Sequence, residues 1–414
     1  MSELKRQLRD LAADEGPPSR LSAHEVYAEA FRRRHRRATA WAAGAVVGVV
    51  LVGAMGVTTA RAPGGSPVTA PHPAQSADGW PAETHDGTII SAAATDATHL
   101  YAGIAACPWQ GQVRHCTARL VGSDDAGRTW TVRQADFGDG RVTAPAPGVL
   151  LRTIEDVASP PPKIEYETRL STDGGRTWRV LRSSPDPVAE VPAGGWVQCA
   201  EPSVQVCTLL AVDPATALAA PLASQPALTI DAPAQVPVSA GVWVTGRDPD
   251  DRSRPAVAVS HDRGRTWSTH VFGREEMPSA YRSAVPHSVD GSTAYTVVSG
   301  SKPTVFRSID GGRSWQPGPE TLPSSAGADG DGFVAADGTH IVLGTTNPPW
   351  LWYAGTAGGY RTVDLPGLDD RLPPARALVR VTAPGVYVAF DNAAVYRSSD
   401  GLRWTRTVIH LPPS

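Results

Sequence analysis

The chain has 414 residues, a formal net charge of −3 and an apolar fraction of 41%. Its 38 basic residues are balanced by 41 acidic ones, so we expect no nucleic-acid partner. Glycine (40) and proline (38) are frequent and aromatic residues make up only 7%. This composition favours short strands interrupted by turns over long helices.

Residues 1–37 are predicted to be a cytoplasmic helical segment. Leu4, Leu8 and Leu11 form an apolar stripe on a first helix, and Ser22 to Glu25 is a capping box that starts a second one. The segment could dock a partner, lie on the anionic leaflet, or only set the topology as a basic flank. The sequence leaves these alternatives open.

Residues 38–60 carry no charge and predict a transmembrane signal-anchor helix, because a span needs ~20 residues. Arginines crowd residues 32–37, whereas the next basic residue after Arg61 is Arg114. This asymmetry predicts a single-pass cell-membrane protein with a cytoplasmic N-terminus and an extracytoplasmic remainder. A cleaved signal peptide ending near Ala60 to Ala62 is the alternative. The long segment before the apolar run, and the length of the run, favour the uncleaved anchor.

Two further features belong to this N-terminal region. Gly44 and Gly48 have the spacing that lets two membrane helices approach closely, which allows a weak transmembrane dimer. Residues 61–84 are rich in proline, glycine, serine, alanine and threonine. They predict an extended linker between the membrane and the domain at residues 85–414.

Within residues 85–414 one octapeptide, S-x-D-x-G-x-T-W, recurs, and we call it the box. Its copies are Ser123–Trp130, Ser171–Trp178, Ser260–Trp267 and Ser308–Trp315, with a shortened copy at Ser398–Trp404. Successive serines are 48, 89, 48 and 90 residues apart. Each long gap is about twice a short one, so we expect an eroded box near Pro214 to Pro221 and another near Ala354 to Arg361. The total is seven units of roughly the 40 to 50 residues that a four-stranded blade needs.

The box has the residue types of a tight turn followed by a strand. Serine and aspartate can accept backbone N–H groups, glycine allows positive φ, and the Thr-Trp pair starts a strand. A calcium site is the alternative, but a signature repeated in every unit favours a structural role. We expect no metal and no cofactor. The structural box residues are Ser123, Asp125, Gly127, Trp130, Ser171, Asp173, Gly175, Trp178, Ser260, Asp262, Gly264, Trp267, Ser308, Asp310, Gly312, Trp315, Ser398 and Asp400.

The box resembles the Asp-box, or BNR repeat, of the sialidase-like β-propellers. The resemblance covers roughly residues 86–414 and implies an all-β propeller of four-stranded antiparallel blades. With the seven units counted from the box spacing, we expect a seven-bladed β-propeller. Sialidases of this family have six blades. Seven box-bearing blades are more similar to propellers of the photosystem II assembly-factor type, which are non-enzymatic scaffolds for other proteins.

Four cysteines form two local pairs. Cys107 and Cys116 precede the first box, and Cys199 and Cys207 occupy the equivalent place before the first eroded box. Such pairs predict two hairpin disulfides in an oxidising compartment. A metal site is the alternative, but neither C-x-x-C nor a paired histidine motif is present.

If the box is the turn between the third and fourth strands, the variable loops lie on the opposite face, which we call the loop face. Loops on a rigid scaffold commonly carry binding residues. Our candidate ligand-binding residues there are Trp109, Arg114, His115, Glu201, Arg247, Asp248, Arg252, Lys302 and Trp350. Asp248 and its neighbours Asp250 and Asp251 could hold calcium, but a solvated turn is favoured.

The sialidase resemblance does not extend to catalytic residues. It implies an arginine triad, a Tyr nucleophile with a Glu, and an Asp acid/base. The first unit has no arginine before Arg114. Tyr281-Arg282 is only distantly similar to the arginine-bearing segment of the family, and it lies in the fifth unit instead of the first. We therefore expect a non-catalytic scaffold that binds an extracytoplasmic protein or glycan on its loop face. An exo-acting glycoside hydrolase of the sialidase type is the alternative.

Overall fold

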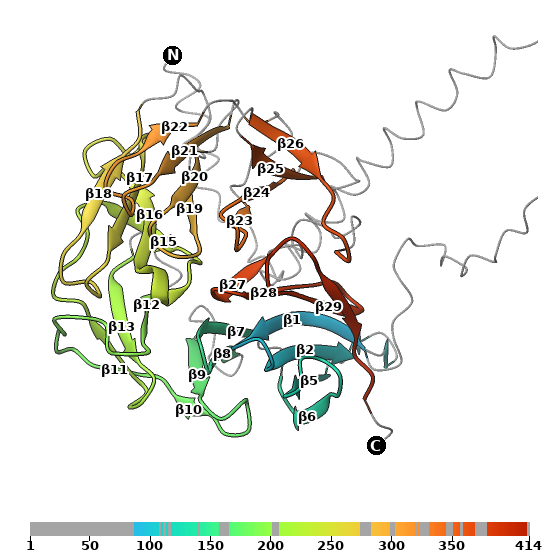
Figure 1. The fold of residues 1–414 in the computed structure, drawn as a ribbon. Coiled ribbons are helices and arrows are strands. Elements are labelled where there is room, and N and C mark those ends of the chain that lie inside the picture. Colours follow the sequence, from blue (N-terminus) through green and yellow to red (C-terminus); the bar gives the residue numbers. More distant parts are fainter. Residues whose placement is uncertain are drawn as a thin grey trace, which may run out of the picture. The chain divides into compact units, whose positions relative to one another are not determined.

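The computed structural model describes fourteen segments of the chain. They are residues 87–106, 109–110, 113–114, 117–138, 141–156, 165–200, 207–273, 283–298, 303–318, 322, 331–344, 351–356, 359–368 and 379–411. The strands among them form seven four-stranded sheets and one small hairpin. Figure 1 shows the seven sheets as blades arranged around a common centre. The predicted seven-bladed β-propeller is confirmed.

Each blade places one strand at the centre and three further out. The strands of each blade are given from the centre outward. Blade 1 is β1 (Thr88–Ala94), β2 (Leu100–Ala106), β5 (Thr117–Ser123) and β6 (Thr131–Gln134). Blade 2 is β7 (Arg141–Ala146), β8 (Val149–Asp156), β9 (Glu165–Ser171) and β10 (Arg179–Val180). Blade 3 is β12 (Trp196–Cys199), β13 (Leu209–Asp213), β14 (Leu218–Pro221) and β11 (Arg182–Ser183). Blade 4 is β15 (Thr229–Pro233), β16 (Val242–Arg247), β17 (Pro255–Ser260) and β18 (Ser268–Val271).

The last three blades follow the same scheme. From the centre outward, blade 5 is β19 (Ala284–Ser288), β20 (Ala294–Val298), β21 (Thr304–Ser308) and β22 (Gln316–Pro317); blade 6 is β23 (Gly332–Val334), β24 (His340–Leu343), β25 (Trp352–Thr356) and β26 (Gly359–Val363); blade 7 is β27 (Arg380–Ala383), β28 (Val386–Phe390), β29 (Ala394–Ser398) and β30 (Thr405–Val408).

The ring closes between the last blade and the first. The backbone N–H of Ile89 donates to the carbonyl of Asn392 at 2.9 Å. Buried side chains from both blades, among them Ala102 of β2 and Val395 of β29, share one apolar cluster. Comparable clusters join the other neighbouring blades, so the core of this domain lies between blades.

All five boxes join the third strand of a blade to the fourth. The eroded copy predicted near Ala354 to Arg361 also lies there, across the turn from β25 to β26, where the Thr356 hydroxyl donates to the Gly359 carbonyl at 2.7 Å. The other eroded copy lies at the turn from β13 to β14. Its Ala217 has a φ of 54°, where the intact boxes have glycine, and is 3% exposed.

Blade 3 departs from the predicted antiparallel pattern. Its outermost strand, β11, precedes the rest of the blade in the chain and pairs in parallel with β14. Further along, Val188 continues this pairing with Leu222. Arg179, directly after the box of blade 2, donates to the carbonyls of Pro214 and Ala215. The chain leaving blade 2 therefore supplies the outermost strand of blade 3, beyond the strand β14 that follows the eroded box.

The predicted localisation needs a correction. Among the residues with a described structure, no helix is long and apolar enough to cross a membrane. The helix found there, η1 (Val238–Ala240), has three residues, whereas a span needs ~20. This finding contradicts the expected single-pass cell-membrane protein. The predicted helices within residues 1–37 and 38–60, and the linker at 61–84, lie outside the described residues.

Candidate functional site

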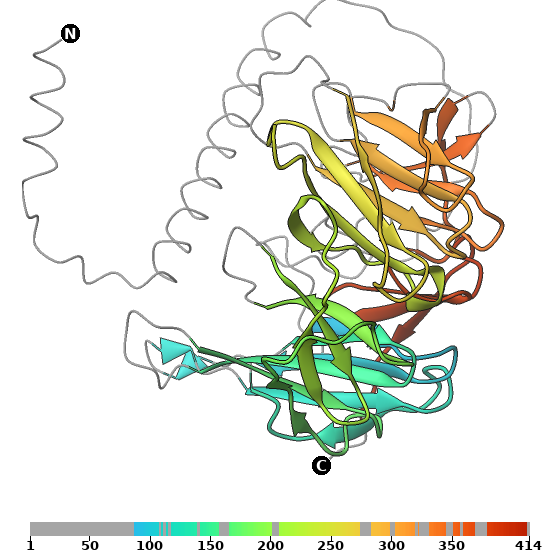
Figure 2. The same cartoon turned by 90° about the vertical axis from the view of Figure 1, so that its left-hand side faces the viewer.

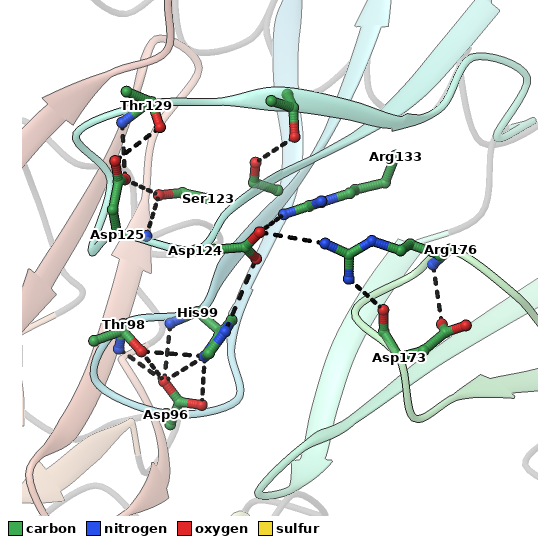
Figure 3. Close-up of polar contacts among 12 residues, drawn as sticks. Asp96, Thr98, His99, Ser123, Asp124, Asp125, Thr129, Arg133, Asp173 and Arg176 are labelled. Carbon is green, nitrogen blue, oxygen red and sulfur yellow. Dashed lines mark hydrogen bonds and ion pairs between the residues drawn. The ribbon is translucent and has the colours of Figure 1, made fainter.

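The boxes lie on one face of the propeller, which we call the box face. Their polar side chains form hydrogen bonds within their own turns. In blade 1 the Ser123 hydroxyl donates to Asp125 at 2.8 Å and accepts the Gly127 N–H at 2.8 Å. Asp125 also accepts the N–H and the hydroxyl of Thr129, at 2.8 and 2.7 Å (Figure 3). The Trp130 indole N–H closes the turn on the Gly127 carbonyl at 3.1 Å.

These hydrogen bonds lower the pKa of the box aspartates. The backbone N–H of Thr129, then its hydroxyl, then that of Ser123 lower the pKa of Asp125 to about 2. The same contacts, led by the Thr266 hydroxyl, lower the pKa of Asp262 to about 2. A carboxylate held in this way stabilises its own turn, which is the structural role expected for the box.

A polar cluster links the boxes of blades 1 and 2. Asp124 pairs with Arg133 of its own blade at 2.6 Å and with Arg176 of blade 2 at 3.3 Å. His99 approaches Asp124 at 3.9 Å and lies 2.7 Å from Asp96 (Figure 3). Each charged group here has a partner, so this cluster connects two blades.

On the loop face, the candidates that the structure describes do not form a common site. Arg247 pairs with Asp231 of the neighbouring strand at 3.2 Å. Asp248 accepts the Asp250 N–H at 3.1 Å and pairs with Arg254 at 3.0 Å. These contacts hold the hairpin of blade 4 together. Arg252 is exposed in the same turn.

The remaining loop-face candidates are described only in part or not at all. Trp109 and Arg114 lie opposite each other in a small hairpin, β3 (Trp109–Gln110) and β4 (Val113–Arg114), between the second and third strands of blade 1. Figure 2 shows this hairpin in cyan, extending beyond the end of its blade. Four candidates lie outside the described residues: His115, Glu201, Lys302 and Trp350.

The predicted cysteine pairs have different outcomes. Cys199 and Cys207 form a disulfide that joins the end of β12 to the start of β13. Cys107 and Cys116 lie outside the described residues, as do Tyr281 and Arg282.

A pocket of about 270 Å³ lies among the innermost strands of blades 4 to 7. Its walls come from the first strands of these blades, β15, β19, β23 and β27, with Thr245 of β16 and Trp352 of β25 behind them. Most of the described lining residues are apolar, including Val285, Phe333 and Val381. Apolar walls with a few polar groups are typical of ligand sites.

The connection between β15 and β16 bounds the pocket on the box face. Ala234 and Gln235 of this connection line the pocket. Further along it, Val238 of η1 packs against the apolar cluster that contains Trp196 of blade 3, and η1 contacts β27 of blade 7. One connection of blade 4 therefore reaches across the centre of the ring to other blades.

A buried hydrogen-bonded chain starts at the pocket wall. His287 lines the pocket, and its Nδ1 lies 3.0 Å from Nε2 of His340. On the other side of His340, Nδ1 lies 2.6 Å from the hydroxyl of Tyr360. Tyr295 stacks on the His340 ring with centroids 4.6 Å apart and planes inclined by 7°. Gly332 leaves room for this arrangement, because a Cβ there would lie 3.0 Å from Cε1 of His287.

His340, the central residue of this hydrogen-bonded chain, is neutral. Burial, and then the neighbouring His287, lower the pKa of His340 well below the ordinary value. Burial also raises the pKa of Tyr360. Neutral His340 carries one N–H, so it donates either to His287 or to Tyr360 and accepts from the other. The tautomers of the two histidines are therefore coupled.

Sequence reasoning missed every residue of this pocket and of the hydrogen-bonded chain that starts at His287. His287, His340 and Tyr360 come from two blades, and the two histidines are 53 residues apart. Neither histidine belongs to the box or to a loop. Their positions inside buried strands resemble those of ordinary core residues, so no spacing pattern marked them.

The fold is that of a seven-bladed β-propeller with a pocket among the first strands of blades 4 to 7. No protein-family model matches the chain, and no curated protein matches it. Among solved structures it is similar to YCF48 bound to a D1 peptide, with 14% identity over 78% of this chain and 83% of that one, at a TM-score of 0.29.

Two enzymes show similar levels of likeness. A puromycin-hydrolysing peptidase of Mycobacterium tuberculosis is 14% identical over 77% of this chain, which spans 52% of the peptidase, at a TM-score of 0.41. The GH93 alpha-L-arabinofuranosidase of Fusarium graminearum with arabinobiose is 14% identical over 79% of this chain and 93% of that one, at a TM-score of 0.34. At these TM-scores none of the three indicates a function for this chain.

Proposed function

We propose that this chain is a non-catalytic binding propeller that takes one group of a protein or glycan ligand into its central pocket from the loop face. The observation that carries the proposal is the pocket itself, an apolar cavity with a few polar groups at the centre of a rigid ring. The box face offers fewer polar groups to a ligand, because the side chains of its turns form hydrogen bonds within those turns.

The strand directions support access from the loop face. In blade 1, β1 ends in a turn whose Thr98 carbonyl accepts the N–H of Ala126 in the box. First strands that run in this direction begin at the loop face and end at the box face. Asp331 and Val379, which precede β23 and β27, therefore lie at the loop-face end of the pocket, and the connection with η1 lies at the other end.

The charges of the pocket support binding without hydrolysis. Glycoside hydrolases commonly place two carboxylates on either side of the scissile bond, about 5 to 10 Å apart. Among the described lining residues Asp331 is the single carboxylate, and none is an arginine or a lysine. The described wall therefore lacks both the second carboxylate and the arginines that a sialidase-type site implies.

An exo-acting glycoside hydrolase of the sialidase type is the second candidate, and an activity assay separates the two. The full chain is incubated with fluorogenic sialosides and a panel of aryl glycosides. We expect no turnover above the uncatalysed rate. Turnover that is lost on Asp331→Asn substitution would reject the binding role in favour of the hydrolase.

A direct test of binding fills the pocket. Val285 lines it, so Val285→Trp should block it, whereas Val132→Trp adds the same bulk to a residue that is 44% exposed on blade 1. Peptide and glycan arrays are probed with the unsubstituted chain and both variants. Loss of bound spots with Val285→Trp alone supports the pocket, and equal binding by all three places the ligand elsewhere.

A further inference from the structure

Two arginines lie at the centre of the ring, outside the pocket. Arg141 is the first residue of β7, and Arg380 is the first residue of β27. These are the innermost strands of blades 2 and 7, and they contact each other at the ring centre (Figure 1). Because first strands begin at the loop face, both arginines lie at the loop-face end of the ring centre.

The side chain of Arg380 points away from the pocket. Its sequence neighbours Val379 and Val381 line the pocket and pack against the apolar cluster of blades 6 and 7. Successive side chains of a strand point to opposite sides, so Arg380 projects from the other side of β27, toward blade 1 and Arg141. The two arginines are therefore separate from the pocket.

Neither guanidinium group has an anionic partner among the described residues, and neither forms a hydrogen bond there. Arg141 is exposed, whereas Arg380 is half-buried. Burial, and then the positive charge of Arg141, lower the pKa of Arg380, so the two charges are close enough to repel each other. Arginine is rarely buried without a partner. An anion placed between these groups would relieve both the repulsion and the lack of a partner.

The chemistry of the pair favours a carboxylate as that anion. A guanidinium group can donate two parallel N–H groups to the two oxygens of a carboxylate, which adds geometric specificity to the charge attraction. Carboxylates are also the ionised groups that proteins and acidic glycans have in common. The exposure of Arg141 at the loop face leaves the pair accessible to such a ligand.

We infer that Arg141 and Arg380 form a carboxylate-binding site at the centre of the ring, on the side of β27 opposite to the pocket. Arg380 supplies the half-buried contact, and Arg141 supplies the exposed one. The inference goes beyond the proposed function, because this site can bind an acidic group whether or not the pocket is occupied.

The test uses matched probes on the full chain. N-acetyl-aspartic acid α-amide and N-acetyl-asparaginamide differ by a carboxylate against a neutral amide, and methyl glucuronide and methyl glucoside make the same comparison for a sugar. Dissociation constants are measured by NMR titration of arginine side-chain N–H signals at constant ionic strength. We expect a carboxylate probe to bind about tenfold more tightly than its neutral counterpart, the gain of hydrogen bonds between charged groups. The carboxylate probe that binds more tightly identifies a polypeptide or a glycan as the source.

Variants of the two arginines locate the binding. Arg141→Gln and Arg380→Gln each remove one charge, and each should abolish most of the preference for the carboxylate. Arg380→Lys keeps the charge without the paired N–H groups, so it should retain only part of the preference. Arg128→Gln is the matched control, because Arg128 is exposed in the box of blade 1 on the opposite face and its loss changes the net charge equally. This control should leave the preference unchanged.

A second measurement needs no ligand. A half-buried arginine beside a like charge destabilises the ligand-free chain, so Arg380→Gln should raise its Tm. Arg128→Gln should leave the Tm unchanged. A lower Tm for Arg380→Gln would show that Arg380 has a structural role, and would overturn the inference.

Three binding results would also overturn the inference. The first is equal affinity for each carboxylate probe and its neutral counterpart. The second is a loss of preference in Arg128→Gln as large as in Arg380→Gln, which would indicate a nonspecific effect of charge. The third is tighter binding of inorganic phosphate than of both carboxylate probes. None of them decides the role of the pocket, which Val285→Trp tests separately.

Discussion

The Nδ1 atom of His287 lies 3.0 Å from the Nε2 atom of His340, so imidazoles from adjacent blades share one hydrogen bond. His287 faces the pocket, whereas His340 is 1% exposed and passes the contact on to Tyr360. The orientation of the His287 ring thus depends, through His340, on a hydroxyl of the neighbouring blade.

Removing the hydroxyl of Tyr360 should destabilise the domain. In Tyr360→Phe the buried Nδ1 of His340 loses its partner at 2.6 Å. An unsatisfied buried polar group costs about 1 to 3 kcal/mol, so we expect the free energy of unfolding in urea to fall by that amount.

Tyr295→Phe is the matched control for this prediction. Its ring also packs against His340, but its hydroxyl makes only a long contact of 3.4 Å with the Gly338 carbonyl. We expect a loss below about 0.5 kcal/mol. Equal losses in the two variants would show that the hydrogen bond between Tyr360 and His340 contributes no more to the free energy of unfolding than the hydroxyl of Tyr295 does.

The boxes show what the sequence could predict about the fold. Their spacing places five turns between third and fourth strands, and the long gaps locate the two eroded turns. This works because the turn depends on side chains within eight residues, for example Ser171 and Asp173, whose contacts are local in sequence. A local requirement that recurs at a fixed interval leaves a visible pattern.

Two parts of the structure leave no such pattern. The parallel strand β11 is held through backbone groups, as where the Arg182 N–H donates to the Ala217 carbonyl at 3.0 Å. Backbone pairing places little demand on residue type. The pocket likewise depends on how blades 4 to 7 meet, and His287, His340 and Thr245 occupy strand positions where any core residue would fit the alternation.

The box serine should stabilise its blade more than its size suggests. Ser171 is 1% exposed, and its hydroxyl accepts the Gly175 N–H at 2.9 Å while donating to Asp173 at 2.8 Å. Ser171→Ala leaves that buried N–H without a partner. We expect a loss of about 1 to 3 kcal/mol in chemical denaturation.

Ser184→Ala is a suitable comparison, because Ser184 accepts the Asp186 N–H at 3.2 Å in a solvent-exposed turn. Its effect should remain within about 0.5 kcal/mol. The box would lose its assigned structural role if Ser171→Ala were equally mild.

The disulfide between Cys199 and Cys207 should contribute to stability through the unfolded chain. It closes a loop with a sequence separation of 8. In the chain-entropy account a loop of this size is worth roughly 2.5 kcal/mol. We expect the double substitution of both cysteines by serine to lower the free energy of unfolding by about that amount. A double variant as stable as the parent chain would contradict the prediction.

Burial of neutral His340 should make the domain less stable in mild acid. Its folded-state pKa lies well below the ordinary 6.5, so below about pH 6.5 the unfolded chain binds a proton that the folded chain does not. The contribution is complete above pH 6.5 and is lost as the pH falls toward the folded pKa, with a slope of up to about 1.4 kcal/mol per pH unit.

The box aspartates do not interfere, because Asp125 and Asp262, with a pKa of about 2 against 3.8, lose their contribution only below about pH 3.8. Burial also lowers the pKa of His270, so the parent chain alone is insufficient. Urea titrations between pH 5 and 7.5 should show a steeper slope for the parent chain than for His340→Gln, by up to one proton, and parallel slopes would exclude His340 as the source.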